Sequence, residues 1–165
     1  ILVLLVIQIA LGGLVAGLKA GFVYDSWPLI DGAFVPSLDR LLFNQPWWSN
    51  LVDNHLTVQF VHRMTAYLLL VLAALHAADC ARSAPGPIRA GALALLLVLL
   101  TQATLGILTL LWNVPITLAL LHQVVAVLAL IVATLHAGRL YAMRPARVRS
   151  EGDARGQPRG ELSMG

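Results

Sequence analysis

The sequence predicts an all-α protein: a polytopic membrane four-helix bundle built from a duplicated helical hairpin. This prediction rests on the composition, on four apolar runs of nearly membrane-spanning length and on a repeated histidine pattern. Of the 165 residues, 59% are hydrophobic and 12% are charged, whereas soluble domains carry about 25% charged residues. The composition excludes a water-soluble globular domain and a disordered chain. A disulfide-stapled secreted module is also excluded, because Cys80 is the single cysteine.

The four apolar runs have the lengths of membrane-spanning helices. They cover residues 1–18, 56–78, 90–112 and 116–138. A helix needs about 20 residues to cross the hydrocarbon core of a bilayer, and it satisfies its backbone hydrogen bonds within the segment. Gln8 interrupts the first run, and Arg63 is the one charge in the second. We therefore expect four transmembrane helices.

The connections between the runs differ in length and character. Residues 19–53 form a long polar loop that holds three of the four tryptophans, a residue enriched at the membrane–water interface. Residues 79–89 and 113–115 are short connections. The end of the chain is rich in arginine and polar residues, which predicts a disordered basic tail. The predicted organisation is a transmembrane domain over residues 1–140 and a cytoplasmic tail over residues 141–165.

Basic residues are distributed unequally between the two sides of the predicted bundle. Eight arginines fall on one side, two in residues 79–89 and six near the end of the chain, whereas Lys19 and Arg40 fall on the other. Cytoplasmic loops carry the excess of lysine and arginine, so the long loop is predicted to face outward, into the periplasm of a bacterial cell. A basic tail beside apolar runs is typical of a membrane anchor rather than of a nucleic-acid-binding face.

Two pairs of histidines repeat with the same spacing. His62 and His76 are 14 residues apart, and so are His122 and His136. Fourteen helical residues rise about 21 Å and return to nearly the same helix face. His62 and His122 are therefore expected at similar depth in the outer half of the membrane, and the other two at its cytoplasmic edge.

The first and third runs repeat as well, which indicates a duplicated hairpin. Gln8 is followed by Gly12, and Gln102 is followed by Gly106 at the same distance. The first run also begins a stripe of small residues, Gly13, Gly17 and Gly21. Such a stripe favours close helix packing, with room for the edge of a porphyrin as the alternative.

Two imidazoles at equal depth on two helices are suited to ligate one iron from opposite sides. Neutral imidazole is the form that binds metals, and a histidine inside a bilayer marks a functional site by default. We therefore take His62 and His122 as candidate metal ligands and haem-binding residues, with interhelical hydrogen bonding as the alternative. His76 and His136 are expected to be solvated at the interface, and His55 to lie on the surface.

Arg63 directly follows the first of these candidate ligands. A charge within a membrane span needs an anion or the interface. A haem propionate would supply the anion, which makes Arg63 a candidate haem-binding residue. Snorkelling to lipid headgroups is the alternative.

Several motifs resemble those of the heme A synthase family. Val-Ala-Gly-Leu-Lys-Ala-Gly at residues 15–21, with Trp-Pro-Leu-Ile-Asp-Gly at residues 27–32, resembles the fifth helix and following outer loop of that family. Gln-Phe-Val-His-Arg at residues 59–63 resembles its sixth-helix histidine motif. Residues 105–110 and 121–123 resemble its seventh and eighth helices. The resemblance covers residues 1–140 in order.

The resemblance implies an eight-helix oxidoreductase made of two similar halves, which oxidises the C8 methyl of heme O to a formyl group in heme A biosynthesis. It implies that this chain is the C-terminal half and that heme b lies between His62 and His122. Where the other half carries a glutamate, this chain has Gln59, and an amide cannot act as a carboxylate base. This half alone is therefore expected to be inactive.

The same resemblance implies partners and a location. The expected partners are the lipid bilayer, heme O through the other half, a heme O synthase and an electron donor. The expected location is the cell inner membrane, or the mitochondrial inner membrane in a eukaryote, with the C-terminus in the cytoplasm.

Two other functions fit the same residues. A di-haem b-type electron-transfer cytochrome would use the outer histidine pair for one haem and His76 with His136 for a second. A non-haem scaffold or half of a transporter would use the histidines as hydrogen-bonding contacts between helices. The number of haems per chain distinguishes the three possibilities.

Reporter fusions test the predicted orientation. A reporter fused after Arg149 should report the cytoplasm, and one inserted near Ser37 should report the outside, because basic residues number eight on one side and two on the other. The reverse pattern would contradict the placement of His62 and His122 in the outer half of the membrane.

Overall fold

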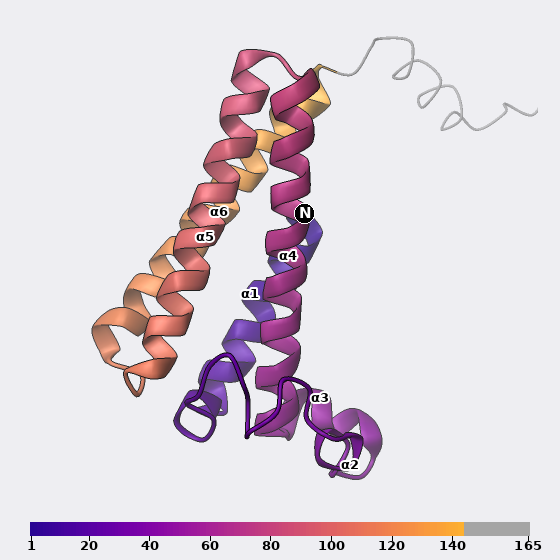
Figure 1. Cartoon of the computed structure of the whole chain (residues 1–165), viewed down its shortest axis with the longest axis vertical. Coiled ribbons are helices and arrows are strands. Elements are labelled where there is room, and N and C mark those ends of the chain that lie inside the picture. Colours follow the sequence, from indigo (N-terminus) through magenta and orange to yellow (C-terminus); the bar gives the residue numbers. More distant parts are fainter. Residues whose placement is uncertain (144–165) are drawn as a thin grey trace, which may run out of the picture.

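A computed structural model describes residues 1–143 of the chain (Figure 1). Its helices are, in order, α1 (Leu2–Gly17), η1 (Ala20–Phe22), α2 (Leu38–Leu41), η2 (Trp47–Ser49), α3 (Asn50–Asp53), α4 (His55–Ser83), α5 (Gly86–Leu111) and α6 (Ile116–Ala142). No strand forms among these residues, so the predicted all-α class is confirmed. The predicted basic tail lies, from residue 144 on, outside the described residues.

Three helices in the described range are long and apolar enough to cross a membrane. They are α4, α5 and α6, with 29, 26 and 27 residues. Helix α1 is apolar but has 16 residues, fewer than the about 20 that a span requires. The length and composition of the three helices make this a multi-pass membrane protein, and the fourth span stays a prediction.

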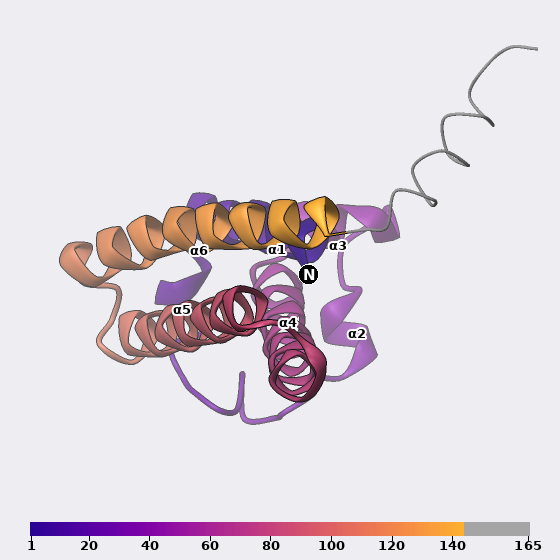
Figure 2. The same cartoon turned by 90° about the horizontal axis from the view of Figure 1, so that it is seen from above.

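The apolar helices are arranged around a shared core. Helix α1 packs against α4 and α5 packs against α6, while contacts of α4 with α5 and of α1 with α6 join the two pairs. Seen from above, α1 and α6 lie along one side and α4 and α5 along the other (Figure 2). All four helices contribute to the core cluster, which consists of Leu5, Leu69, Ala73, Leu95, Leu99, Ala129 and Ala133. The alanines let backbones approach closely, and van der Waals packing is a main attraction between helices in lipid.

The ends of α4 and α5 explain why these helices extend beyond the apolar runs. The side chain of Asn54 accepts hydrogen bonds from the backbone N–H groups of Leu56 at 3.0 Å and Thr57 at 3.3 Å, which caps the first turn of α4. Helix α4 continues through polar residues to Ser83. Helix α5 then begins with a proline in its first turn, where the missing N–H and fixed φ of proline are tolerated.

The α5–α6 connection is the tight turn that the sequence predicts. Asn113 and Val114 have φ values of 59° and 56°, a region that is strained for a β-branched residue. The Val114 N–H donates to the Thr109 oxygen at 2.8 Å. Val114 also packs on η1, because a Cβ atom at Gly21 would lie 3.1 Å from its Cγ2. The turn of the second pair therefore contacts the start of the outer loop.

Polar side chains of α4 hold the outer loop by its backbone carbonyls. The Gln59 amide donates to the oxygens of Ala20 at 3.2 Å and Tyr24 at 3.0 Å, and its own oxygen accepts from Arg63 at 3.0 Å. Arg63 also donates to the Leu29 oxygen at 3.2 Å. Gln59 acts as donor and acceptor at once, which an ionised carboxylate cannot do.

Arg63 is buried against the outer loop instead of extending toward lipid headgroups. The side chain is 8% exposed, and its guanidinium donates to protein oxygens, with that of Tyr24 as a further acceptor at 3.4 Å. Such burial does not fit the snorkelling alternative. The proposed contact of Arg63 with a haem propionate stays a prediction.

Replacing Gln59 by glutamate tests this anchoring. Gln59→Glu should lower the free energy of unfolding by about 1–3 kcal/mol, the usual cost of disrupting a buried hydrogen-bonded polar group, because a carboxylate cannot donate and would lie against the carbonyl oxygens of Ala20 and Tyr24. The melting temperature in a fixed detergent measures the effect. Gln45→Glu, at an exposed loop position, is the matched control, and an equal shift in both variants would contradict the anchoring role.

Candidate functional site

His62 lies where α4 contacts α1. The side-chain amide of Gln8 donates to Nδ1 of His62 and to the His62 backbone oxygen, both at 3.1 Å. The ring lies against Gly12, where a Cβ atom would stand 3.2 Å from Cε1. The glutamine therefore orients the half-buried ring, and the glycine leaves space for it.

His122 has the same two neighbours where α6 contacts α5. The amide nitrogen of Gln102 lies 3.4 Å from Nε2 of His122. A Cβ atom at Gly106 would stand 2.9 Å from Cε1 of the ring, which is closer than real Cβ atoms approach. The glutamine and glycine noted in the first and third apolar runs are thus the residues that surround the two outer histidines.

Some buried polar atoms around His62 and His122 lack hydrogen-bond partners. Among residues 1–143, no partner is found for Oε1 of Gln8, Oε1 of Gln102 or Nδ1 of His122. Leaving such an atom unsatisfied costs about 1–3 kcal/mol, and it calls for an ion, water or ligand as an explanation. The outer histidine level is therefore a polar centre that the protein's own groups do not complete.

The prediction of a packing stripe is wrong for two of its three glycines. A Cβ atom at Gly13 or Gly17 would meet nothing within 4 Å in the described part of the chain, whereas Gly21 contacts Val114. The glycine of α1 that faces a neighbouring helix is Gly12. Successive residues differ by about 100° around a helix, so the spacing of small residues does not show which face is packed.

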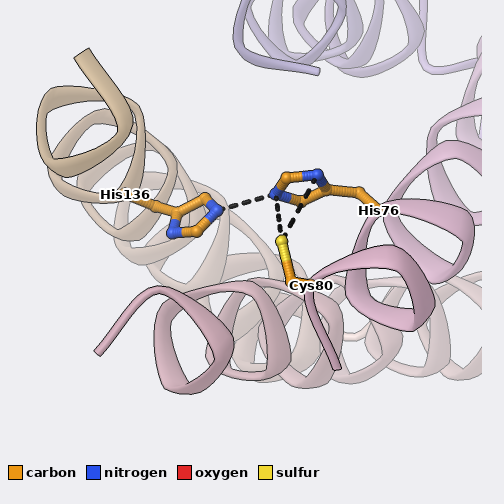
Figure 3. Close-up of side chains that lie close together, drawn as sticks. All are labelled: His76, Cys80 and His136. Carbon is orange, nitrogen blue, oxygen red and sulfur yellow. Dashed lines mark hydrogen bonds between the residues drawn. The ribbon is translucent and has the colours of Figure 1, made fainter. Parts of the chain in front are cut away.

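The inner histidines are also brought together, contrary to the expectation of separate, solvated side chains (Figure 3). His136 is 4% exposed, and its Nε2 lies 2.7 Å from Nε2 of His76. The rings meet edge to face with centroids 5.0 Å apart. Two axial nitrogens on one iron lie about 4 Å apart at metal–nitrogen distances of about 2 Å. The two nitrogens of the inner pair lie closer together than this, and the di-haem alternative stays a prediction.

Two residues at this inner level escaped the sequence analysis. Sγ of Cys80 lies 3.7 Å from Nε2 of His76, and a Cβ atom at Gly91 would stand 2.5 Å from Nδ1 of His136. The four-residue spacing of His76 and Cys80 places both on one helix face and could have revealed the first contact.

His55, which the sequence placed on the surface, is half-buried at the start of α4.

Comparison with known proteins identifies the family to which this chain belongs. Residues 1–134 match the family described as cytochrome oxidase assembly protein, COX15-CtaA. The chain belongs to this family. No solved structure matches the chain.

Curated relatives of this cytochrome oxidase assembly family member are identical to it at more than half of the aligned residues. The heme A synthase of Rhodopseudomonas palustris strain HaA2 is 57% identical over 144 residues, which are 87% of this chain and 40% of the relative. That of Bradyrhizobium diazoefficiens is 56% identical over 146 residues, 88% of this chain and 41% of the relative. The chain thus spans about two fifths of the length of the relatives it matches.

Glycine substitutions in this family member test the contact between α5 and His122. Gly106→Ala should lower the free energy of unfolding by about 1–3 kcal/mol, because the added methyl overpacks against the ring. Gly13→Ala is the matched control: its Cβ meets open space, and replacing a helical glycine gains about 0.5–1 kcal/mol. Melting temperatures in one detergent should therefore move in opposite directions. A shift of the same sign in both variants would contradict the contact.

Proposed function

We propose that this chain is the C-terminal, haem-b-binding half of a heme A synthase, the enzyme that oxidises the C8 methyl of heme O to a formyl group. Family membership and the heme A synthases among the relatives support the assignment. The observation that carries it is the matched setting of His62 and His122, each with a glutamine amide and a glycine from the neighbouring helix.

The residues at the outer level suit a haem. Two imidazoles would supply axial ligands, and the unsatisfied atoms of Gln8, Gln102 and His122 support the presence of a further group at this centre. Hydrogen bonds from neighbouring side chains fix the orientation of ligating histidines, which is the role we assign to the two glutamines. A bound haem would supply one-electron chemistry at its iron.

Arg63 is included in this proposal as a haem-binding residue. Its guanidinium donates hydrogen bonds to oxygens of Leu29, Tyr24 and Gln59, and a guanidinium carries five N–H donors. Donors therefore remain for a propionate, and charge-assisted hydrogen bonds to a carboxylate are the stronger class.

Gln59 supports assigning the cofactor, rather than the oxidation step, to this half. Its amide donates to two loop carbonyls and accepts from Arg63, so the chain uses it to hold structure, and an amide cannot serve as a carboxylate base. We infer that methyl oxidation takes place on the other half of the enzyme. This half alone would bind haem without turnover.

The proposed architecture is a duplicated hairpin in which α1 with α4 corresponds to α5 with α6. The first helix of each pair carries the glutamine and the glycine four residues later, and the second carries the histidine. We place the bundle in the bacterial inner membrane, or the mitochondrial one in a eukaryote, with its C-terminus in the cytoplasm. A heme O synthase and an electron donor are its proposed partners.

Histidine substitutions test the haem assignment. His62→Ala and His122→Ala should each abolish the low-spin, bis-histidine absorption spectrum and reduce bound haem severalfold, because each removes one axial ligand. His55→Ala is the matched control and should keep one haem per chain. Haem content and spectra of the purified proteins give the measurement. A bis-histidine spectrum that survives both outer substitutions would refute the assignment.

A further inference from the structure

The inner ends of α4 and α6 bring three metal-ligating side chains together (Figure 3). His76 and Cys80 come from one face of α4, and His136 comes from α6. Nε2 of His76 lies 2.7 Å from Nε2 of His136 and 3.7 Å from Sγ of Cys80. One ligand atom of each residue lies within 4.8 Å of the others, and within residues 1–143 this is the one such group of three.

Helix α5 holds two of these side chains in place. Gly91 admits the His136 ring, because a Cβ atom there would stand 2.5 Å from Nδ1. Cys80 of α4 is buried in an apolar cluster with Ile88 and Ala92 of α5. Close packing against α5 therefore restricts the side-chain rotamers of Cys80 and His136.

A purely structural role does not account for the arrangement. The pair His76 and His136 shares one hydrogen bond, but Nδ1 of His136 is buried without a partner among the described residues. Such an atom costs about 1–3 kcal/mol. As a contact between helices, the cluster therefore stabilises the bundle little or not at all.

We propose that His76, Cys80 and His136 form a binding site for a single thiophilic metal ion, Cu(I). At metal–nitrogen distances of about 2.0–2.1 Å and a metal–sulfur distance of about 2.3 Å, a trigonal site places two ligating nitrogens about 3.6 Å apart and a nitrogen and sulfur about 3.8 Å apart. The distance of 3.7 Å between Nε2 of His76 and Sγ of Cys80 already has nearly this value. The two imidazole nitrogens need to separate by about 0.9 Å to reach the trigonal spacing.

The donor set and its surroundings favour Cu(I) over Zn²⁺. Thiolate ligands select soft ions, and two histidines with one cysteine are a known trigonal copper set. One thiolate and two neutral imidazoles make a neutral site with Cu(I) but leave one positive charge with Zn²⁺. An uncompensated charge among apolar groups is unfavourable, and structural zinc sites take four protein ligands.

A cavity lies beside the two imidazoles of the cluster. Its volume is about 300 Å³, and both rings line it. The other lining residues are aliphatic: Ile1, Leu2, Leu95, Ala133, Ala137 and Leu140. The cavity leaves space next to the imidazoles, and the thiol would release its proton when the ion binds.

A competition titration tests the site. The 165-residue chain, reduced and metal-free in detergent, is titrated anaerobically with Cu(I) against a chromogenic chelator. We expect one Cu(I) per chain and an ultraviolet thiolate-to-copper absorption. Cys80→Ser and His136→Gln should each weaken binding by more than about 100-fold, beyond the 10–100-fold that follows loss of a ligand's supporting hydrogen bond. His55→Ala is the control and should bind as the wild type does.

Haem content, measured on the same samples, separates this proposal from the proposed function. Cys80→Ser should retain its haem, which also verifies its fold, and His62→Ala should retain Cu(I) binding. Equal Cu(I) affinity in the wild type and Cys80→Ser would overturn the site. Tighter binding of Zn²⁺ than of Cu(I) would overturn the choice of metal. A second haem per chain that His136→Gln removes would show that the site takes a porphyrin instead.

Discussion

Three of the four histidines in the bundle lie against a residue that has no Cβ atom, and these close contacts constrain how the helices pack. Gly12 faces His62, Gly106 faces His122 and Gly91 faces His136. In each case the glycine and the histidine come from adjacent helices, so the contact fixes both the register and the separation of the helices. The apolar core between the two levels packs within the spacing that these contacts set.

The outer histidines, His62 and His122, and the inner histidines, His76 and His136, differ in the side chains that lie beside them. The amides of Gln8 and Gln102 lie beside the outer rings of His62 and His122. This arrangement suits the proposed role of the glutamines, which is to orient the two imidazoles toward a haem. At the inner level, the rings contact each other and a thiol replaces the amide, which favours a compact centre. The difference arises from which side chains accompany the imidazoles, because the helix spacing of 14 residues is the same at both levels.

Much of the fold follows from the sequence because membrane helices are encoded locally. The apolar runs locate α1, α4, α5 and α6 to within a few residues, and the extra turn at the end of α4 contains Asp79, Arg82 and Ser83, which end the apolar run before the helix ends. The contacts of His76 with His136 and of Arg63 with the loop depend on how distant segments meet, which hydropathy and spacing do not encode. The error over Gly13 and Gly17 has the same origin, since a stripe of small residues does not identify its partner. Assignment of His62 and His122 as ligands remains a prediction from sequence to which the structure adds a matched environment.

Recognition of the outer loop through its main chain has an evolutionary consequence. Gln59 and Arg63 bond to carbonyl oxygens of residues 20, 24 and 29, and Thr57 donates to that of Leu41. Every amino acid carries such an oxygen, so these contacts constrain the path of the loop and leave the identity of its residues free. Exposed positions of the loop can therefore diverge and acquire new surface chemistry, whereas the buried Ile30, Leu41 and Asn50 remain constrained by their side-chain packing.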